Sequence, residues 1–395
     1  MASGTDPQRV RLALLSRRVV TGTRPAFSGH VAVAEGKIAS VGPGPPPESF
    51  RGRTVDVGDA VVGPGLVDLH VHGAGGHCPI WGGAAEVGAM AVFLAQRGTS
   101  AFRPTLMGEP ERVKALLTEL GPLRMPPGAA RLVGVHLEGP FLNPARRGAC
   151  DERFLRPVDT RLMEELLRAA PGLCRQVTLA PELDGAPELI SWLTGEGVLV
   201  AAGHSDATYC QARGAFEAGV RHITHLFNAM RPFHHREPGL LGAALEDDRV
   251  SCELIADGIH LHPAALRLAF RLKGARGVCL VSDASPAAGM PPGEYRFLGR
   301  EVLVDGSGAC RFSDGTLAGS SITLADAVAF VVRHGVASWE EAFISASLVP
   351  ARLAGVSHRK GTLEVGKDAD LVVMNDAGEV LWSLVGGVVM RAPDR

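Results

Sequence analysis

The chain has 395 residues, of which 46% are hydrophobic and 21% are charged, and its formal net charge is −2. This length exceeds one average domain but suits a large α/β barrel with a small companion domain. The balanced charge argues against binding to nucleic acid or to an anionic membrane surface, and no apolar run reaches the roughly 18 residues that a membrane span needs.

Seven cysteines are present without a Cys-x-x-Cys motif. An odd number without that spacing predicts reduced thiols rather than a disulfide framework. The first residues lack the basic and then apolar pattern of a secretion signal. We therefore expect a cytoplasmic protein.

Both ends of the chain are rich in short β-strand patterns. The predicted strands cover residues 11–15, 31–34, 37–41 and 53–57, and then 371–374, 380–384 and 388–391. Neither end alone has enough apolar surface for a sheet of its own. We therefore predict that residues 1–60 and 356–395 form one small β-sandwich domain.

The middle of the chain alternates strand and helix patterns. Eight strands are predicted at residues 61–72, 99–105, 131–138, 176–181, 198–204, 222–226, 251–256 and 278–283. Most intervals can hold a helix, for example 85–96, 161–169, 207–218 and 263–273. This alternation predicts an α/β fold in which residues 61–355 form a (β/α)8 TIM-like barrel.

Metal-binding and acid–base residue types end six of the eight predicted strands. His70 and His72 leave the first strand on one face, because side chains in a strand alternate with period two. The other candidates are Glu138, His204, His225, Asp257 with His260, and Asp283. Since active sites in such barrels lie at the carboxyl ends of the strands, this coincidence of position predicts a catalytic rim.

These residue types favour metal-assisted hydrolysis. Imidazoles and carboxylates suit zinc, iron or manganese, and such an ion lowers the pKa of bound water to about 7. Asp283 could accept a proton from that water and deliver it to a leaving amine. Taken alone, Asp283 could equally be a helix N-cap, and the two histidines of the first strand could be core residues.

Several longer motifs carry a resemblance to a known family. They are HLEGPF at 136–141, GHS at 203–205, HLFNAM at 225–230, REPG at 236–239, ADGIH at 256–260, LAGS at 317–320 and GTLEVGKDAD at 361–370. Together they resemble the amidohydrolase superfamily and, within it, the N-acetylglucosamine-6-phosphate deacetylase family. The match covers residues 10 to 392.

The resemblance implies a metal centre with named ligands. Glu138, His204 and His225 match the ligands of one divalent ion, while His70 and His72 make a second ion possible, bridged by Glu138. The expected cofactor is therefore one or two divalent ions per subunit, with zinc the first choice and iron or manganese as alternatives. Asp283 matches the general base and acid, which shuttles the proton as metal-held hydroxide attacks the acetyl carbonyl.

The resemblance also implies a set of substrate contacts. They are Ala149, Asn228, Ala229, Arg236, Asp257, His260, Leu317, Ala318 and Gly319. Arg236 matches an arginine that reaches the phosphate in the neighbouring subunit, which implies a homodimer. Cys150 stands where many relatives have histidine, and it is either a modulator of the site or a neutral substitution.

The expected activity is deacetylation of N-acetyl-D-glucosamine 6-phosphate to D-glucosamine 6-phosphate and acetate, in amino-sugar catabolism and cell-wall recycling. The resemblance leaves two alternatives. One is another amidohydrolase, which acts on a related N-acetyl sugar phosphate or on a cyclic amide. The other is a non-catalytic sugar-phosphate sensor.

Overall fold

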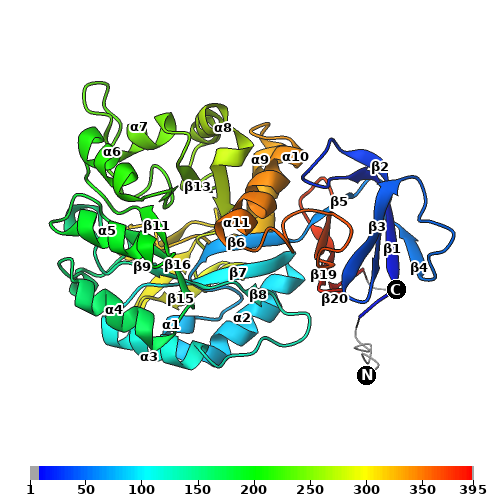
Figure 1. Ribbon diagram of the computed structural model, residues 1–395, viewed down its shortest axis with the longest axis horizontal. Coiled ribbons are helices and arrows are strands. Elements are labelled where there is room, and N and C mark those ends of the chain that lie inside the picture. Colours follow the sequence, from blue (N-terminus) through cyan, green and yellow to red (C-terminus); the bar gives the residue numbers. More distant parts are fainter. Residues whose placement is uncertain (1–8, 394–395) are drawn as a thin grey trace.

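The computed structural model describes residues 9–393 of the chain (Figure 1). The expectation that no secretion signal is present concerns residues 1–8 and lies outside the described residues. Within the described range, no helix is both long and apolar enough to cross a membrane. All seven cysteines lie in this range as free thiols.

A closed parallel barrel forms the larger part of the molecule. Its strands follow one another in the order β6, β7, β9, β10, β11, β12, β13 and β14, and the short β8 pairs with β7. The last strand returns to the first, because the Asp283 amide donates to the His70 carbonyl and the His72 amide donates to the Ala284 carbonyl, both at 2.9 Å. The strands are β6 (Leu66–Val71), β7 (Thr99–Leu106), β8 (Arg131–Leu132), β9 (Val135–Glu138), β10 (Cys174–Leu179), β11 (Leu199–Ala202), β12 (His222–Ile223), β13 (Ser251–Ile255) and β14 (Val278–Val281).

Helices cover the outside of this barrel (Figure 1). Helix α6 shows how the sequence starts them: the Thr208 hydroxyl accepts from the Gln211 amide, and the Gln211 side chain accepts from the Thr208 amide, which satisfies two free donors of the first turn. The helices are α1 (Pro79–Gly82), α2 (Ala84–Gln96), α3 (Pro110–Leu120), α4 (Thr160–Ala169), α5 (Ala186–Gly195), α6 (Tyr209–Ala218), α7 (Gly239–Glu246), α8 (Pro263–Gly277), α9 (Leu324–Arg333), α10 (Trp339–Phe343) and α11 (Val349–Leu353), with shorter helical turns at Pro144–Arg146, Glu152–Phe154 and Ile344–Leu348.

Both ends of the chain join one smaller sheet beside the barrel (Figure 1). Its strands are β1 (Leu12–Val19), β2 (Phe27–Ala34), β3 (Lys37–Pro43), β4 (Arg53–Asp56), β5 (Val61–Pro64), β18 (Leu371–Met374), β19 (Val380–Val385) and β20 (Val388–Arg391). Side chains from both ends, such as Val31 and Leu384, share one apolar cluster. The predicted fold class is thus confirmed, while the division at residues 60 and 356 stays a prediction.

Two predicted strands are each broken in two. The strand expected at 61–72 ends at Pro64 in the small sheet and restarts at Leu66 in the barrel. Gly65 lies at the break, where an added Cβ would come within 2.7 Å of the Ser100 side chain. The strand expected at 131–138 breaks at Gly134, whose φ of 114° favours glycine. The first prediction was wrong because an apolar pattern does not show where a strand passes from one sheet to another. The second was wrong because Gly134 interrupts the strand, although both halves pair with β7.

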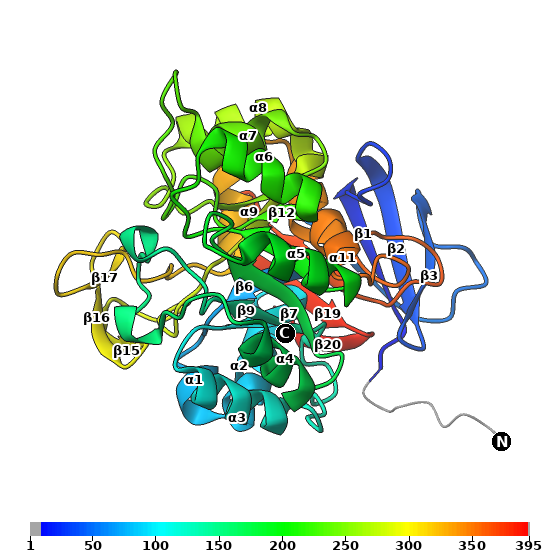
Figure 2. The same ribbon diagram turned by 60° about the vertical axis from the view of Figure 1, so that its left-hand side comes forward.

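A third, three-stranded sheet was not predicted. It consists of β15 (Gly293–Phe297), β16 (Arg300–Val304) and β17 (Cys310–Phe312). Figure 2 shows it, in yellow, standing out from the barrel on the left of the view. Its place in the chain, between β14 and α9, carries it over the carboxyl ends of the barrel strands, where Phe297 and Arg311 line a pocket.

Candidate active site

The chemistry-bearing residues meet at the carboxyl ends of the barrel strands. Glu138 is the last residue of β9, whereas His204, His225 and Asp283 each follow their strands by two residues. These last three residues have φ values between 30° and 49°, in the left-handed region that side chains other than glycine rarely adopt. Such backbone strain is typical of functional sites, since the surrounding fold must hold it in place.

Two groups of potential metal ligands lie side by side. The first triad is His70, His72 and Asp283, and the second triad is Glu138, His204 and His225. Within each triad the ligand atoms lie within 4.8 Å of one another, and all six side chains are buried. The predicted strand-end residues are therefore brought together as two adjacent clusters rather than one.

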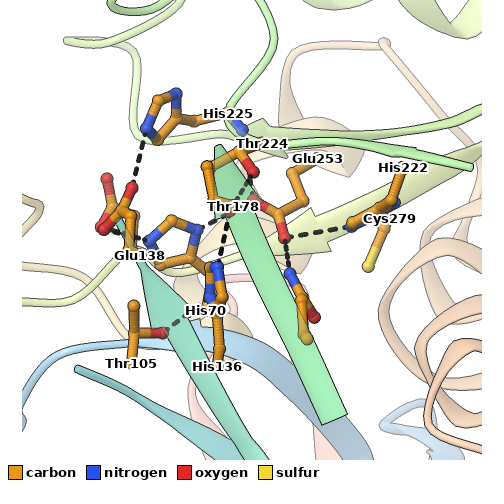
Figure 3. Close-up of polar contacts among 12 residues, drawn as sticks. His70, Thr105, His136, Glu138, Thr178, His222, Thr224, His225, Glu253 and Cys279 are labelled. Atoms are coloured by element: carbon orange, nitrogen blue, oxygen red, sulfur yellow. Dashed lines mark hydrogen bonds and ion pairs between the residues drawn. The ribbon is translucent and has the colours of Figure 1, made fainter. Parts of the chain in front are cut away.

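The carboxylate of Glu138 lies between the two triads. Its Oε1 lies 3.0 Å from His204 Nε2 and 3.1 Å from His225 Nε2. Its Oε2 lies 3.0 Å from His72 Nε2 and 3.4 Å from His70 Nε2. Figure 3 shows Glu138 facing His225. Each oxygen thus belongs to a different pair of imidazoles, which is the arrangement of a bridging ligand.

The donor set fits divalent metal ions. Although two imidazole nitrogens lie within 3.4 Å of Glu138 Oε2, this buried oxygen makes no hydrogen bond with either of them. The Nε2 atoms of His204 and His225 approach each other to 3.1 Å. Neutral imidazole nitrogens with their lone pairs aimed at one point gain nothing from each other, but a cation between them would bind both. The residues present therefore fit one metal ion in each triad.

Asp283 is placed to hold a proton as well as to contact a metal. Its Oδ1 lies 3.3 Å from His70 Nε2 and 3.4 Å from His72 Nε2. Burial alone would raise the pKa of Asp283, but the two imidazoles hold that pKa below its ordinary value. The carboxylate is therefore ionised at neutral pH, as a general base requires.

Glu253, which no sequence argument singled out, supports the first triad from inside the barrel. Its Oε2 lies 2.8 Å from His70 Nδ1, and its Oε1 lies 3.0 Å from His222 Nε2. Figure 3 shows the second of these contacts. Burial opposes its ionisation, but the neighbouring His70 and His222 hold the pKa of Glu253 well below its usual range. The carboxylate thus directs the opposite nitrogen of His70 toward Glu138. The only sequence signal for Glu253 was its position as an acidic residue in an otherwise apolar predicted strand.

A pocket of about 370 Å³ opens over the two triads, a size that suits a small metabolite. The predicted residues that line it are His72, Ala149, Glu138, His204, His225, Asn228, Ala229, His260, Asp283, Leu317 and Gly319. Residues that sequence reasoning missed also line it, namely Met107, Gly148, Phe297, Leu298, Arg311 and Thr316. The hairpin that carries Phe297 turns at Leu298–Gly299, where both φ values are positive, and Gly299 was the sequence signal for that turn.

Five predicted residues lie outside the lining of this pocket. His70 is fully buried beneath it, and Ala318 is buried beside it. Asp257 accepts a hydrogen bond from the His260 amide at 2.7 Å and faces His260 Nδ1 at 2.6 Å, so it positions His260. Arg236 is exposed on a surface loop next to His235. Cys150 packs in an apolar cluster with Met107 and Phe297.

The Cys150 thiol is held in its neutral form. Burial is the main cause that raises its pKa to about 12, and the nearby charge of Glu138 adds to the effect. A thiol in that state is a poor nucleophile and a slow target for oxidation. Its surroundings therefore favour packing over the modulating role that the sequence left open.

Comparison with known proteins places the chain in a family. Residues 61–390 match the model of the amidohydrolase family. The chain is similar to N-acetylglucosamine-6-phosphate deacetylase from Bacillus subtilis strain 168, with 37% identity over 374 residues that cover 93% of this chain and 94% of the relative. It is also similar to N-acetylgalactosamine-6-phosphate deacetylase from Escherichia coli O157:H7, with 36% identity over 93% of this chain and 97% of the relative.

A solved structure agrees with these relatives. The N-acetyl-D-glucosamine-6-phosphate deacetylase of Mycobacterium smegmatis, a mutant in complex with N-acetyl-D-glucosamine-6-phosphate, matches with a TM-score of 0.90 and 33% identity. The match covers 97% of this chain and all of that chain. The chain belongs to the amidohydrolase family, as its motifs predicted.

Proposed function

We propose that this amidohydrolase hydrolyses the acetamide bond of N-acetyl-D-glucosamine 6-phosphate. The products are D-glucosamine 6-phosphate and acetate, and the reaction belongs to amino-sugar metabolism. The observation that carries the proposal is the bridging position of Glu138 between two triads at the floor of a metabolite-sized pocket. The named deacetylases among its relatives support the same activity.

In the proposed site, Glu138, His204, His225, His70 and His72 hold one or two divalent ions, with zinc first and iron or manganese next. A bound ion of this kind acidifies water and polarises a carbonyl oxygen. Asp283 takes the proton of the attacking water as the new carbon–oxygen bond forms. It then gives that proton to the amide nitrogen as the carbon–nitrogen bond breaks, so that acetate and a free amine leave.

We assign the sugar and its phosphate to the mouth of the pocket. Ala149, Asn228, Ala229, Leu317 and Gly319 line the wall there, and the buried Ala318 lies between Leu317 and Gly319. Arg311 also lines the pocket; it donates to the Gly315 carbonyl at 2.9 Å, and its guanidinium forms no salt bridge with a carboxylate in residues 9–393. We infer that Arg311 and His260 bind the phosphate from within the same chain, since a guanidinium fits phosphate oxygens in pairs.

We further propose a homodimer in which Arg236 reaches the phosphate in the neighbouring subunit. The loop around it exposes Phe233, which is 57% accessible, together with Arg236 itself. Mixing Arg236→Ala chains with Asp283→Asn chains should restore activity, because one site of each mixed dimer then has both groups. Mixed chains that stay as inactive as the separate variants would contradict shared sites.

The free cysteines support a reducing compartment, and we propose the cytoplasm.

Acetate release tests the activity directly. We expect turnover of N-acetyl-D-glucosamine 6-phosphate that a chelator abolishes and added zinc restores. Arg311→Ala should raise KM at least tenfold for this substrate and leave the slow turnover of unphosphorylated N-acetylglucosamine unchanged. The N-acetylgalactosamine 6-phosphate epimer is the second candidate substrate, because one relative carries that name. A kcat/KM higher for the galactosamine epimer would reverse the assignment of the sugar.

A further inference from the structure

A second, larger cavity of about 820 Å³ opens at the opposite end of the barrel. It is formed where β9, β10 and β11 begin and where the segment 353–360 passes beneath them. Its ionisable lining residues are Arg103, Arg131, Arg175, Arg359 and Lys360, and no acidic side chain of the described residues lines it. Because active sites of these barrels occupy the carboxyl ends of the strands, this cavity is separate from the catalytic pocket.

Arg103 is the most deeply buried charged residue of this cavity, and it forms no salt bridge with a described carboxylate. It is only 1% exposed, and its donors reach the Val133 carbonyl at 3.3 Å, Gln176 Oε1 at 3.0 Å and the Leu353 carbonyl at 3.2 Å. All three acceptors are neutral. Buried charges are normally paired, and a guanidinium has five N–H groups, so Arg103 keeps both charge and donors for an anion.

The other cations differ in how far they are neutralised. Arg359 is paired with Asp368 and Lys360 with Asp370, so neither adds much free charge. The side chains of Arg131 and Arg175 make no hydrogen bond or ion pair with any residue in the range 9–393. Three guanidiniums thus face one cavity without a carboxylate, which is the arrangement by which proteins bind phosphate groups.

A buried chain of hydrogen bonds runs from this cavity to the active site. Arg103 donates to Gln176 Oε1, and Gln176 Nε2 donates to Glu253 Oε1 at 3.1 Å. Glu253 Oε2 then meets His70 Nδ1 at 2.8 Å and accepts from the His225 amide at 3.2 Å. Every side chain in this chain is fully or almost fully buried. A movement of Arg103 would therefore displace Glu253, which contacts His70 of the first triad and His225 of the second.

We propose that the cavity at the amino ends of the barrel strands is a regulatory site for a small anion that carries phosphate. Arg131 and Arg175 bind the anion at the entrance, and Arg103 meets it at the floor. When Arg103 turns toward the anion, it weakens its bond to Gln176, and Glu253 then shifts relative to His70. Binding is expected to change kcat, and this second part rests on the proposed deacetylase activity.

Titration of the metal-loaded enzyme tests the binding. The probes are inorganic phosphate and fructose 1,6-bisphosphate. The bisphosphate is preferred to an inorganic polyphosphate because it binds divalent metals far less and so leaves the metal in the enzyme. The titration is made in the Arg311→Ala background, which weakens phosphate binding in the catalytic pocket, because D-glucosamine 6-phosphate carries a phosphate itself and would compete for the proposed site. Calorimetry should show one saturable site per chain, and the double variant Arg131→Ala/Arg175→Ala should bind at least tenfold more weakly. Arg271→Ala, which removes an exposed arginine of α8, is the matched control. The absence of saturable binding of both probes, or equal binding by the double variant, would overturn the site.

Kinetics test the coupling separately. Saturating bisphosphate should change kcat at least threefold in the unmodified enzyme and in the Arg271→Ala control, but not in the double variant. Gln176→Met interrupts the hydrogen-bond chain while leaving the entrance intact, so it should bind the probe without the change in kcat. Binding without any effect on kcat in the unmodified enzyme would overturn the regulatory role alone. An enzyme without deacetylase activity that still bound the probe would contradict the proposed function and not the site.

Discussion

The two triads differ in what holds their histidines in place. In the first triad, the Nδ1 of His70 faces the buried carboxylate of Glu253 at 2.8 Å. In the second triad, the Nδ1 of His204 faces the Arg146 carbonyl at 3.0 Å, and the Nδ1 of His225 is buried without a partner. A carboxylate fixes the tautomer of a ligand histidine and makes its other nitrogen more basic.

This difference changes the expected importance of the two triads. The sequence made His70 and His72 the optional part of the metal centre, because the resemblance secured only Glu138, His204 and His225. The structure holds His70 more firmly than either histidine of the second triad. Glu138 belongs to the second triad and also contacts the histidines of the first. Its loss should therefore weaken metal binding in both triads, so that they no longer differ in importance.

Glu138→Gln is the largest expected loss. The amide cannot bridge two cations, so activity should fall by about 10³-fold or more, and metal content should fall in both triads. Elemental analysis after dialysis in a metal buffer measures this, with thermal unfolding as a check on folding. His70→Ala and His225→Ala are the matched controls, and each should keep the metal of the other triad. Full metal content in the Glu138→Gln variant would contradict the proposal that Glu138 bridges two metal ions.

Asp283→Asn should separate proton transfer from metal binding within the first triad. Loss of the proton carrier should lower kcat by about 10³-fold, in the range of general acid–base catalysis. The metal content should stay near that of the unmodified enzyme, because His70, His72 and Glu138 remain. Asp305→Asn, an exposed change in the turn between β16 and β17, should have no effect on kcat or metal content. A variant with normal kcat would show that Asp283 does not carry the proton.

The sequence predicted which side chains meet at the barrel rim better than it predicted where the strands begin and end. His204, His225 and Asp283 were found because the carboxyl ends of parallel strands meet at one rim, so a position in the chain fixes a position in space. Glu253 and Arg103 were missed because their partners come from other strands, and no local pattern reports contacts across a barrel interior. The hairpin that carries Phe297 was missed because its turn, Leu298–Gly299, is not one of the Asn-Gly or Asp-Gly pairs that mark hairpins in a sequence.

Glu253→Gln tests the difference between the triads directly. It removes the charge behind His70 and keeps the shape, so metal should bind the first triad about 10- to 100-fold more weakly. Metal titration followed by calorimetry measures this, and Glu301→Gln, an exposed change on β16, is the control. The second triad should be nearly unaffected, although the His225 amide loses a charged acceptor. Equal weakening of both triads would mean that Glu253 acts on the barrel interior as a whole.

The smallest expected effect lies outside both triads, at His260. Burial opposes the charged form, but Asp257, through its hydrogen bond and its charge, raises the pKa of His260 above 6.5. A raised pKa means that the imidazolium and its pair with Asp257 persist at pH 6.5 and are lost as the pH rises through the folded value. If His260 binds phosphate, KM for the phosphorylated substrate should rise a few-fold over that interval, because a charged hydrogen bond exceeds a neutral one by about 1 kcal/mol. Asp257→Asn should move the rise to lower pH, whereas titration of the substrate phosphate, which is common to both enzymes, stays fixed. An unchanged midpoint would contradict a role of His260 in phosphate binding and leave that role to Arg311.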